Sequence, residues 1–325
     1  MQGQGGQRGE ADQTHSAGAA DGNVPFMTGD KIVLLLSMIT YGIGQTVLFI
    51  VLQPLVEKIG LTLIQFGFIM AVSNLALALA AVYWGKKSDV IGRKPTLVLG
   101  LIGYVVGSAM VAVCLEWGLR SSPDPMVLFG MLLAARLVYG LLASAINPAA
   151  TAYIADTTSR ANRARGMALL GMTAGVGALL GPLIGGVFAF ISPVAPMYVA
   201  IGLAIIAMVA MLALMDEPGK HAEAQQAASA APLVWYDRRV LPFLILLTGF
   251  WMCFTMIQII TAFYIEKQIG IEGVTRVQQS MMAALVCMAI AAVIMQTVVI
   301  QYFRISTKAM CRIGLPLFAV GLIIL

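Results

Sequence analysis

Long apolar segments with almost no charge recur along this chain, and they limit most strongly how it can fold. The segments lie at residues 31–53, 66–84, 95–115, 126–154, 166–191, 194–215, 241–265, 277–303 and 309–325. A transmembrane helix needs about 20 mainly apolar residues, and every segment except the last is long enough. A composition of 60% hydrophobic and 11% charged residues is also far from that of a soluble domain. The sequence therefore predicts an all-α polytopic membrane protein with nine spans, of which the ninth is incomplete.

The lysines and arginines are unevenly distributed between the two sides of these spans. If the N-terminus is cytoplasmic, 15 of them fall on the cytoplasmic side and 4 on the opposite side. Because cytoplasmic loops carry an excess of Lys and Arg, this bias predicts a cytoplasmic N-terminus. The same distribution accounts for the pI near 9.1, so we expect no nucleic-acid partner.

Four regions follow from the pattern of polar and apolar stretches. Residues 1–29 have almost no bulky apolar side chain, which predicts a disordered cytoplasmic tail. Residues 30–215 hold six predicted spans, residues 216–240 form a polar cytoplasmic linker, and residues 241–325 hold three more spans. We expect the last region to be part of a second half, because the chain stops at Leu325 inside an apolar segment.

Arg136 is the one clear charge deep inside a predicted span. An ionisable group near the middle of a bilayer costs at least about 2.5 kcal/mol, so it normally faces a bundle interior or water. On one helix it would share a face with Gly140, Ala143, Asn147 and Thr151. The alternative is a side chain that reaches the membrane surface, but the helix end is on the order of 15 Å away. We therefore predict a polar cavity beside Arg136.

Other polar or aromatic residues deep in the predicted spans are candidates for the same cavity. They are Tyr41, Gln45, Asn74, Tyr139, Asn147, Thr255, Gln258 and Gln296. Tyr41 and Gln45 lie one helical turn apart. Each of these residues alone could equally form a hydrogen bond between helices without touching a substrate.

No side chain in the sequence is an obvious proton carrier or catalyst. All 15 acidic residues fall in loops, tails or span ends, so the proton-carrying carboxylate is not identifiable in these residues. The alternatives are an acid in the spans expected after residue 325, or Glu57, Glu116 or another acid at a span end. His15 and His221 lie outside the spans, and the four cysteines lack metal-ligand spacing. We expect neither an enzyme nor a metal site, since no nucleophile and base are paired in the pattern.

Two short stretches stand out by their glycines. From Gly171 to Gly186 the sequence GMTAGVGALLGPLIGG places its glycines within an arc of roughly 180° on one helix. Such a face lets another backbone approach closely, and Pro182 removes one helical hydrogen bond. The spacing alone does not separate a helix that changes its packing from an ordinary tight interface. The loop GKKSDVIGRK allows tight turns at its glycines and places Asp89 four residues before Arg93, where the two can pair.

Three motifs in this sequence resemble those of the major facilitator superfamily. GxxxDxxGRK resembles the signature loop of that superfamily, and LLAARLVYG resembles its fourth-span arginine motif. GxxxGPxxGG resembles the fifth-span motif of the drug:proton antiporter branch, and AYIADTTSRANRARG looks like the cytoplasmic link of tetracycline and multidrug exporters. The motif residues are Gly85, Asp89, Gly92, Arg93 and Lys94 in the loop, Arg136 and Gly140 in the fourth span, and Gly177, Gly181, Pro182, Gly185 and Gly186 in the fifth.

This resemblance implies twelve spans in two halves around a central cavity, of which this chain would supply nine. It implies that Asp89, together with Arg93 and the eleventh helix, latches an outward-open state, and that Arg136 takes part in proton handling. We expect a proton-coupled exporter of small amphipathic compounds, without a cofactor, acting as a monomer in a bacterial-type inner membrane. One departure is that tetracycline-type relatives carry an acidic residue where this chain has Tyr41 and Gly42.

Two alternatives stay open at this stage. An uptake symporter for a small metabolite uses the same fold, although the glycine-proline motif favours export. A truncated, non-transporting remnant is also compatible with nine spans, because Asp89 would then have no eleventh helix to contact. Substrate identity cannot be read from the fold.

Overall fold

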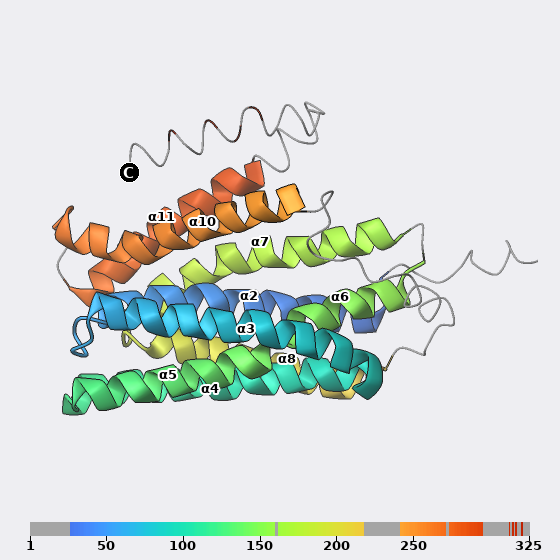
Figure 1. Ribbon diagram of the computed structural model, residues 1–325, viewed down its shortest axis with the longest axis horizontal. Coiled ribbons are helices and arrows are strands. Elements are labelled where there is room, and N and C mark those ends of the chain that lie inside the picture. Colours follow the sequence, from blue (N-terminus) through green and yellow to red (C-terminus); the bar gives the residue numbers. More distant parts are fainter. Residues whose placement is uncertain are drawn as a thin grey trace, which may run out of the picture.

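The computed structural model describes residues 27–159, 162–217, 241–270 and 273–294, with positions 312, 314, 316 and 320. All regular structure in these residues is helical. Figure 1 shows the helices as long rods that lie side by side. The helices are α2 (Gly29–Leu55), α3 (Leu63–Ile91), α4 (Arg93–Ser121), α5 (Pro125–Ala143), α6 (Ile146–Thr157), α7 (Arg163–Phe188), α8 (Ala195–Leu214), α10 (Leu241–Lys267) and α11 (Val274–Ile294).

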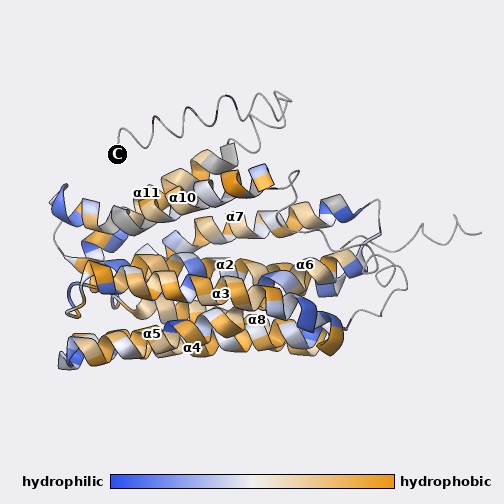
Figure 2. Ribbon diagram, in the orientation of Figure 1, coloured by the Kyte–Doolittle hydropathy of each residue, from blue (hydrophilic) through white to orange (hydrophobic). Residues whose placement is uncertain are grey.

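Six spans in the described residues are long and apolar enough to cross a membrane, with α5 and α6 together forming one of them. They coincide with the first six predicted segments, and α10 and α11 fall on the seventh and eighth. Apolar residues run along the rods and polar residues gather toward their ends (Figure 2). The prediction of an all-α polytopic membrane protein is confirmed. The tail before residue 27, most of the linker and nearly all of the ninth segment lie outside the described residues.

The helix ends define two sides of the bundle. The basic end carries Gly29, residues 85–94, residues 158–165 and residues 215–217, and it holds most of the lysines and arginines of the described residues. The segment predicted as a loop at 85–94 is helical except at Gly92, where α3 ends and α4 begins. The opposite end carries residues 56–62, 122–124, 189–194 and 268–273.

Local sequence explains where two helices begin at the opposite end. Thr62 Oγ1 accepts a hydrogen bond from the backbone N–H of Gln65 at 3.2 Å, and Gln65 Oε1 accepts one from the N–H of Thr62 at 2.9 Å. This reciprocal pair satisfies two donors that the first turn of α3 leaves free. Asp124 caps α5 in the same sense, since its Oδ1 accepts from the N–H of Met126 at 2.7 Å.

The fourth span is not one continuous helix, although a single helix over residues 126–154 was predicted. It breaks between α5 and α6, where Ala145 N–H donates to the carbonyl of Leu142 at 3.1 Å. Pro148 explains the break, because it has no N–H to offer the carbonyl four residues earlier. Arg136, Gly140 and Ala143 are buried before the break, whereas Asn147 and Thr151 after it are exposed. The single face expected from helical periodicity therefore ends at the break.

The core forms where α2 packs against α7 and α8, while α4 and α3 pack against α5. One apolar cluster lies toward the opposite end and contains Val51, Leu55 and Leu115. A second lies toward the basic end and contains Tyr41, Tyr104 and Tyr139. This second cluster surrounds the candidate site.

Candidate functional site

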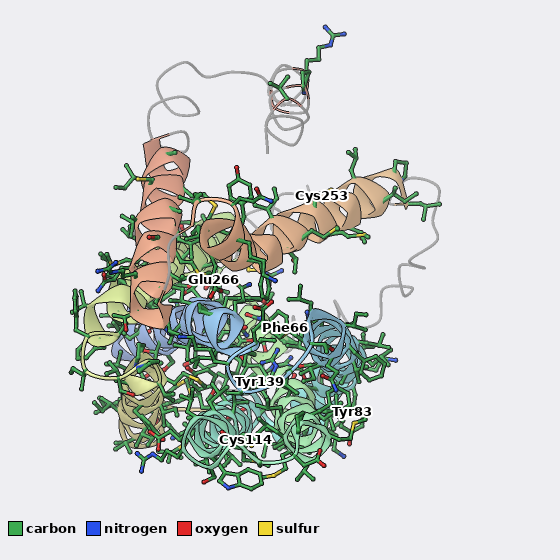
Figure 3. The ribbon with its side chains drawn as sticks, turned by 90° about the vertical axis from the view of Figure 1, so that its left-hand side faces the viewer. Phe66, Tyr83, Cys114, Tyr139, Cys253 and Glu266 are labelled. Atoms are coloured by element: carbon green, nitrogen blue, oxygen red, sulfur yellow. The ribbon has the colours of Figure 1, made fainter. Side chains whose placement is uncertain are left out.

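Arg136 lies inside the bundle and not at its surface, with 2% of the residue exposed. Its guanidinium carbon stands 4.7 Å from the centre of the Tyr139 ring, one turn further along α5. In an end-on view, Tyr139 lies among the helices of the bundle (Figure 3). The ring face attracts the cation through its quadrupole.

Gln45 of α2 joins the two tyrosines that flank Arg136. Its amide Nε2 donates to Tyr41 Oη at 2.7 Å and also to Tyr139 Oη. The second bond crosses from α2 to α5 over 94 residues of sequence. The structure therefore brings together four of the residues predicted for the cavity, namely Tyr41, Gln45, Arg136 and Tyr139.

Tyr104 of α4 completes this cluster and was missed in the sequence. Its ring meets those of Tyr41 and Tyr139 edge-on, with both centroid distances at 5.9 Å. Room for these rings comes from glycines on neighbouring helices. A Cβ on Gly44 would overlap the ring of Tyr104, and one on Gly107 would lie 2.8 Å from Cα of Tyr139. The signal in the sequence was the set of glycines at positions 100, 103 and 107 around Tyr104.

Gly140, the second residue of the fourth-span motif, fixes α3 beside Arg136. A Cβ on Gly140 would stand 2.7 Å from the carbonyl oxygen of Ser73. Glycine at this position therefore allows the backbones of α5 and α3 to lie in direct contact. Ser73 Oγ donates to the carbonyl of Arg136 at 3.1 Å. The motif glycine thus allows α3 to hold the backbone from which Arg136 extends.

The remaining cavity candidates do not join this cluster in the described part of the chain. Asn74 and Asn147 are exposed, and Thr255 is half-buried in α10. The side chain of Gln258 and the whole of Gln296 lie outside the described residues.

The loop motif forms a network of ion pairs at the basic end. Arg93 begins α4, and its Nη2 stands 2.6 Å from Oδ1 of Asp89, which confirms the pairing expected from their spacing. Its Nε also donates to Oδ2 of Asp156, at the end of α6, at 2.8 Å. Asp156 is the less exposed partner, since 18% of its side chain is exposed against 62% for Asp89. One guanidinium thus links the ends of α3, α4 and α6.

Glu217, just after α8, caps the start of α4. Its two carboxylate oxygens accept from the backbone N–H groups of Arg93 and Lys94 at 2.6 and 2.8 Å. A carboxylate is favourable there because the N-terminus of a helix carries partial positive charge. Gly92, the residue before α4, has a φ of 111°. A Cβ on Gly92 would lie 2.7 Å from Glu217 Oε1. The loop therefore requires glycine at this position for both its backbone angle and its space.

Sequence reasoning missed Asp156 and Glu217 as partners of this loop. Both are acidic residues at predicted span ends on the same side as the basic loop. Their position on the same side of the membrane as the basic residues could have predicted these contacts. The contact expected between Asp89 and an eleventh helix lies outside the described residues.

The glycine-proline motif lies along the contact between α7 and α2. Cβ atoms on Gly177, Gly181 and Gly185 would each lie 3.0 Å or less from atoms of α2, and one on Gly186 would overlap Met282 of α11. Thr46 Oγ1 donates to the carbonyl of Gly177 at 3.4 Å across this contact. The close packing predicted for this face is confirmed for these four positions. Gly171 and Gly175 differ, because nothing lies within 4 Å of a Cβ placed there.

Two hydrogen bonds join α10 and α11 to the rest of the bundle at the opposite end. Lys267 Nζ donates to Glu57 Oε1 at 2.8 Å, and Gln278 Nε2 donates to the carbonyl of Pro193 at 3.1 Å. Met282 packs against Gly186 one turn further in. α11 packs against α7 and α2, and α10 packs against α11 and α2 (Figure 1).

Residues 34–325 match the family profile described as Major Facilitator Superfamily. The chain belongs to this superfamily. Similar proteins include an MFS-type transporter from Aspergillus terreus, 28% identical over 155 residues, which are 48% of this chain and 26% of the relative. The class B tetracycline resistance protein of Escherichia coli is 34% identical over 151 residues, covering 46% and 34%. The quinolone resistance protein NorA of Staphylococcus aureus is 27% identical over 194 residues, covering 60% and 47%.

Each of these matches covers less than half of the relative's own length. Two solved structures have the same fold at 17% sequence identity. The D-xylose-proton symporter superposes with a TM-score of 0.60 over 81% of this chain and 65% of the symporter. The human organic anion transporter MFSD10 superposes with a TM-score of 0.55 over 85% and 72%.

Membership of the major facilitator superfamily confirms the resemblance read from the three motifs. In this member the motifs occupy three separate places. The loop motif holds the basic end together, the arginine motif lies in the bundle interior, and the glycine-proline motif forms the contact of α7 with α2.

Proposed function

We propose that this protein is a proton-coupled secondary transporter that exports small amphipathic compounds by alternating access. The observation that carries the proposal is the guanidinium of Arg136, buried among Tyr41, Gln45 and Tyr139. An ionisable group kept deep in a membrane protein is expensive and normally marks a substrate or ion pathway. The relatives named for tetracycline and quinolone resistance support export of drug-like cargo.

Alternating access also accounts for the distribution of contacts at the two ends. The contacts described between α2–α8 and the pair α10–α11 lie at the opposite end, at Glu57, Pro193 and Gly186. A transporter closed at that end would open toward the basic end. We propose that the basic end is cytoplasmic, as the excess of Lys and Arg there favours. We further propose that the protein acts as a monomer in the plasma membrane, with protons and a small molecule as its only partners.

The test is to measure accumulation of tetracycline and of a quinolone in bacterial cells that lack their own exporters. Expression of the full natural chain should lower accumulation, and a protonophore should abolish the difference. Arg136→Ala should lose the effect at equal membrane abundance, whereas Arg120→Ala should keep it, because 77% of the Arg120 side chain is exposed.

Two outcomes would overturn this proposal. A rise in accumulation on expression would indicate an uptake symporter. No change with any compound of this class, from protein that is present in the membrane, would indicate a non-transporting remnant.

A further inference from the structure

The guanidinium of Arg136 has no acidic partner in the described part of the chain. Its Nε and Nη1 atoms are buried and make no hydrogen bond there. The ion pairs formed by the described residues join other side chains. In the sequence, none of the 15 Asp and Glu residues falls deep in a predicted span, since all of them lie in loops, tails or span ends.

The surroundings of this cation do not neutralise it. Tyr139 contributes its ring face, which attracts the guanidinium but carries no net charge. The phenol oxygens of Tyr41 and Tyr139 are already engaged with Gln45. A buried charge without a counter-ion is strongly unfavourable, and leaving its donors unpaired adds a further penalty. An anion at this site would remove both penalties.

The cluster around Arg136 also suits the rest of such a ligand. Three tyrosine rings, those of Tyr41, Tyr104 and Tyr139, provide apolar faces with polar tips, as small-molecule sites commonly do. Gln45 is half-buried, whereas the three tyrosines and Arg136 are buried. Arg136 is the single charge deep in the predicted spans, which matches one negative charge better than two.

We propose that Arg136 binds the carboxylate of a monoanionic, aromatic or aliphatic cargo, so that the substrate itself supplies the counter-ion. This inference rests on the proposed transport function and specifies its substrate class. Guanidinium and carboxylate form short, charge-assisted hydrogen bonds, and Arg suits this recognition better than Lys because of its planar donor geometry.

The test uses the purified full chain in lipid nanodiscs prepared in gluconate buffer. The probes are 4-phenylbutyrate and its neutral amide, which differ only at the carboxyl group. At a concentration about five times its dissociation constant, the acid should raise the unfolding midpoint by about 2–4 °C. The amide should leave the midpoint unchanged, and so should the acid added to Arg136→Gln. Arg120→Gln is the matched control and should respond to the acid as the natural protein does.

A second measurement keeps the proposal falsifiable if the probe is a poor ligand. Without any probe, Arg136→Gln should unfold at the same temperature as the natural protein or higher, because it removes a charge that has no partner. A lower midpoint would mean that the guanidinium already has sufficient stabilising partners within the protein, and it would overturn the proposal. Equal shifts with acid and amide would also overturn it. So would the same shift with sodium chloride alone, because the counter-ion would then be inorganic.

These readouts need no proton gradient, so they separate this inference from the proposed function. Export of neutral compounds with no carboxylate binding would overturn the substrate class and leave transport standing. Carboxylate binding without transport would support the carboxylate site and overturn the proposed transport function.

Discussion

Gly177 of α7 faces Gly42 of α2 so closely that a Cβ atom on Gly177 would lie 2.8 Å from both Cα and the carbonyl carbon of Gly42. The contact is mutual, since a Cβ on Gly42 would lie 3.2 Å from Cα of Gly177. Small residues are expected in such a helix contact within a membrane, where helices associate by close packing and not by the hydrophobic effect. The pair therefore sets how near α7 can come to α2.

We predict that Gly177→Ala lowers the unfolding midpoint in detergent, because the added methyl group forces two backbones apart. Overpacking of this kind costs about 1–3 kcal/mol, which outweighs the gain of about 1 kcal/mol in helix propensity. Gly175→Ala is the matched control, since its Cβ would meet nothing within 4 Å, and it should be neutral or slightly stabilising. Equal midpoints for the two variants would contradict the packing described here.

Transport should respond to a larger side chain on the same face. A Cβ on Gly181 would overlap Thr46 and lie 2.9 Å from the carbonyl oxygen of Ile43, so Gly181→Leu should block the approach of α7 to α2. We expect export to fall by on the order of tenfold or more. Gly171→Leu, placed where a Cβ meets open space, should keep most activity. Near-normal export by Gly181→Leu would show that this contact is not needed.

The two partners of Arg93 should differ in importance. Asp156 is mostly covered, whereas Asp89 is mostly exposed to solvent. We therefore expect Asp156→Asn to destabilise the protein by about 1–3 kcal/mol, while Asp89→Asn costs about 0–1 kcal/mol. Thermal unfolding of both variants in low salt measures the difference. A larger loss for Asp89→Asn would place the main ion pair elsewhere.

The cap that Glu217 provides to α4 leads to a separate prediction. Glu217→Ala should destabilise the protein by about 1 kcal/mol, because two N–H groups lose their acceptor. Asp216→Ala is the matched control, since its side chain is exposed and only its carbonyl oxygen accepts a bond, from Tyr153. The unfolding midpoint should fall for the first variant and stay constant for the second. Equal decreases in the unfolding midpoints of both variants would show that loss of the helix cap does not explain the destabilisation.

The bridge from Lys267 to Glu57 should report on closure of the opposite end. Its hydrogen bond to Glu57 raises the pKa of Lys267 above the ordinary value of 10.5. The contribution of protonated Lys267 to the ion pair is therefore present at neutral pH and is lost only as the pH rises through that raised pKa.

Cross-linking tests whether the two residues lie close together. With the four native cysteines replaced by serine, Glu57→Cys and Lys267→Cys should be joined by a short bifunctional maleimide. Glu116→Cys with Lys267→Cys should not be joined, and equal yields from both pairs would contradict the described contact.

The sequence by itself determined the spans and the local pairings. Uncharged apolar runs of this length can satisfy their backbone hydrogen bonds in lipid only as helices, so the six described spans fell where they were predicted. The pairing of Asp89 with Arg93 was also predictable, because residues four apart meet on any helix. Pro148 could have predicted the break between α5 and α6, because proline lacks a backbone N–H. The sequence-based prediction instead extended one helix through it.

Only the tertiary structure decided which distant groups meet. Gln45 bonds to Tyr139 and Arg93 to Asp156 across long stretches of sequence, and no local periodicity encodes such partners. Packing also separated the glycines, because Gly177 contacts α2 while Gly175 on the same helix contacts nothing. The physical reason is that backbone geometry repeats along one helix, whereas the rotation and approach of two helices depend on every side chain between them.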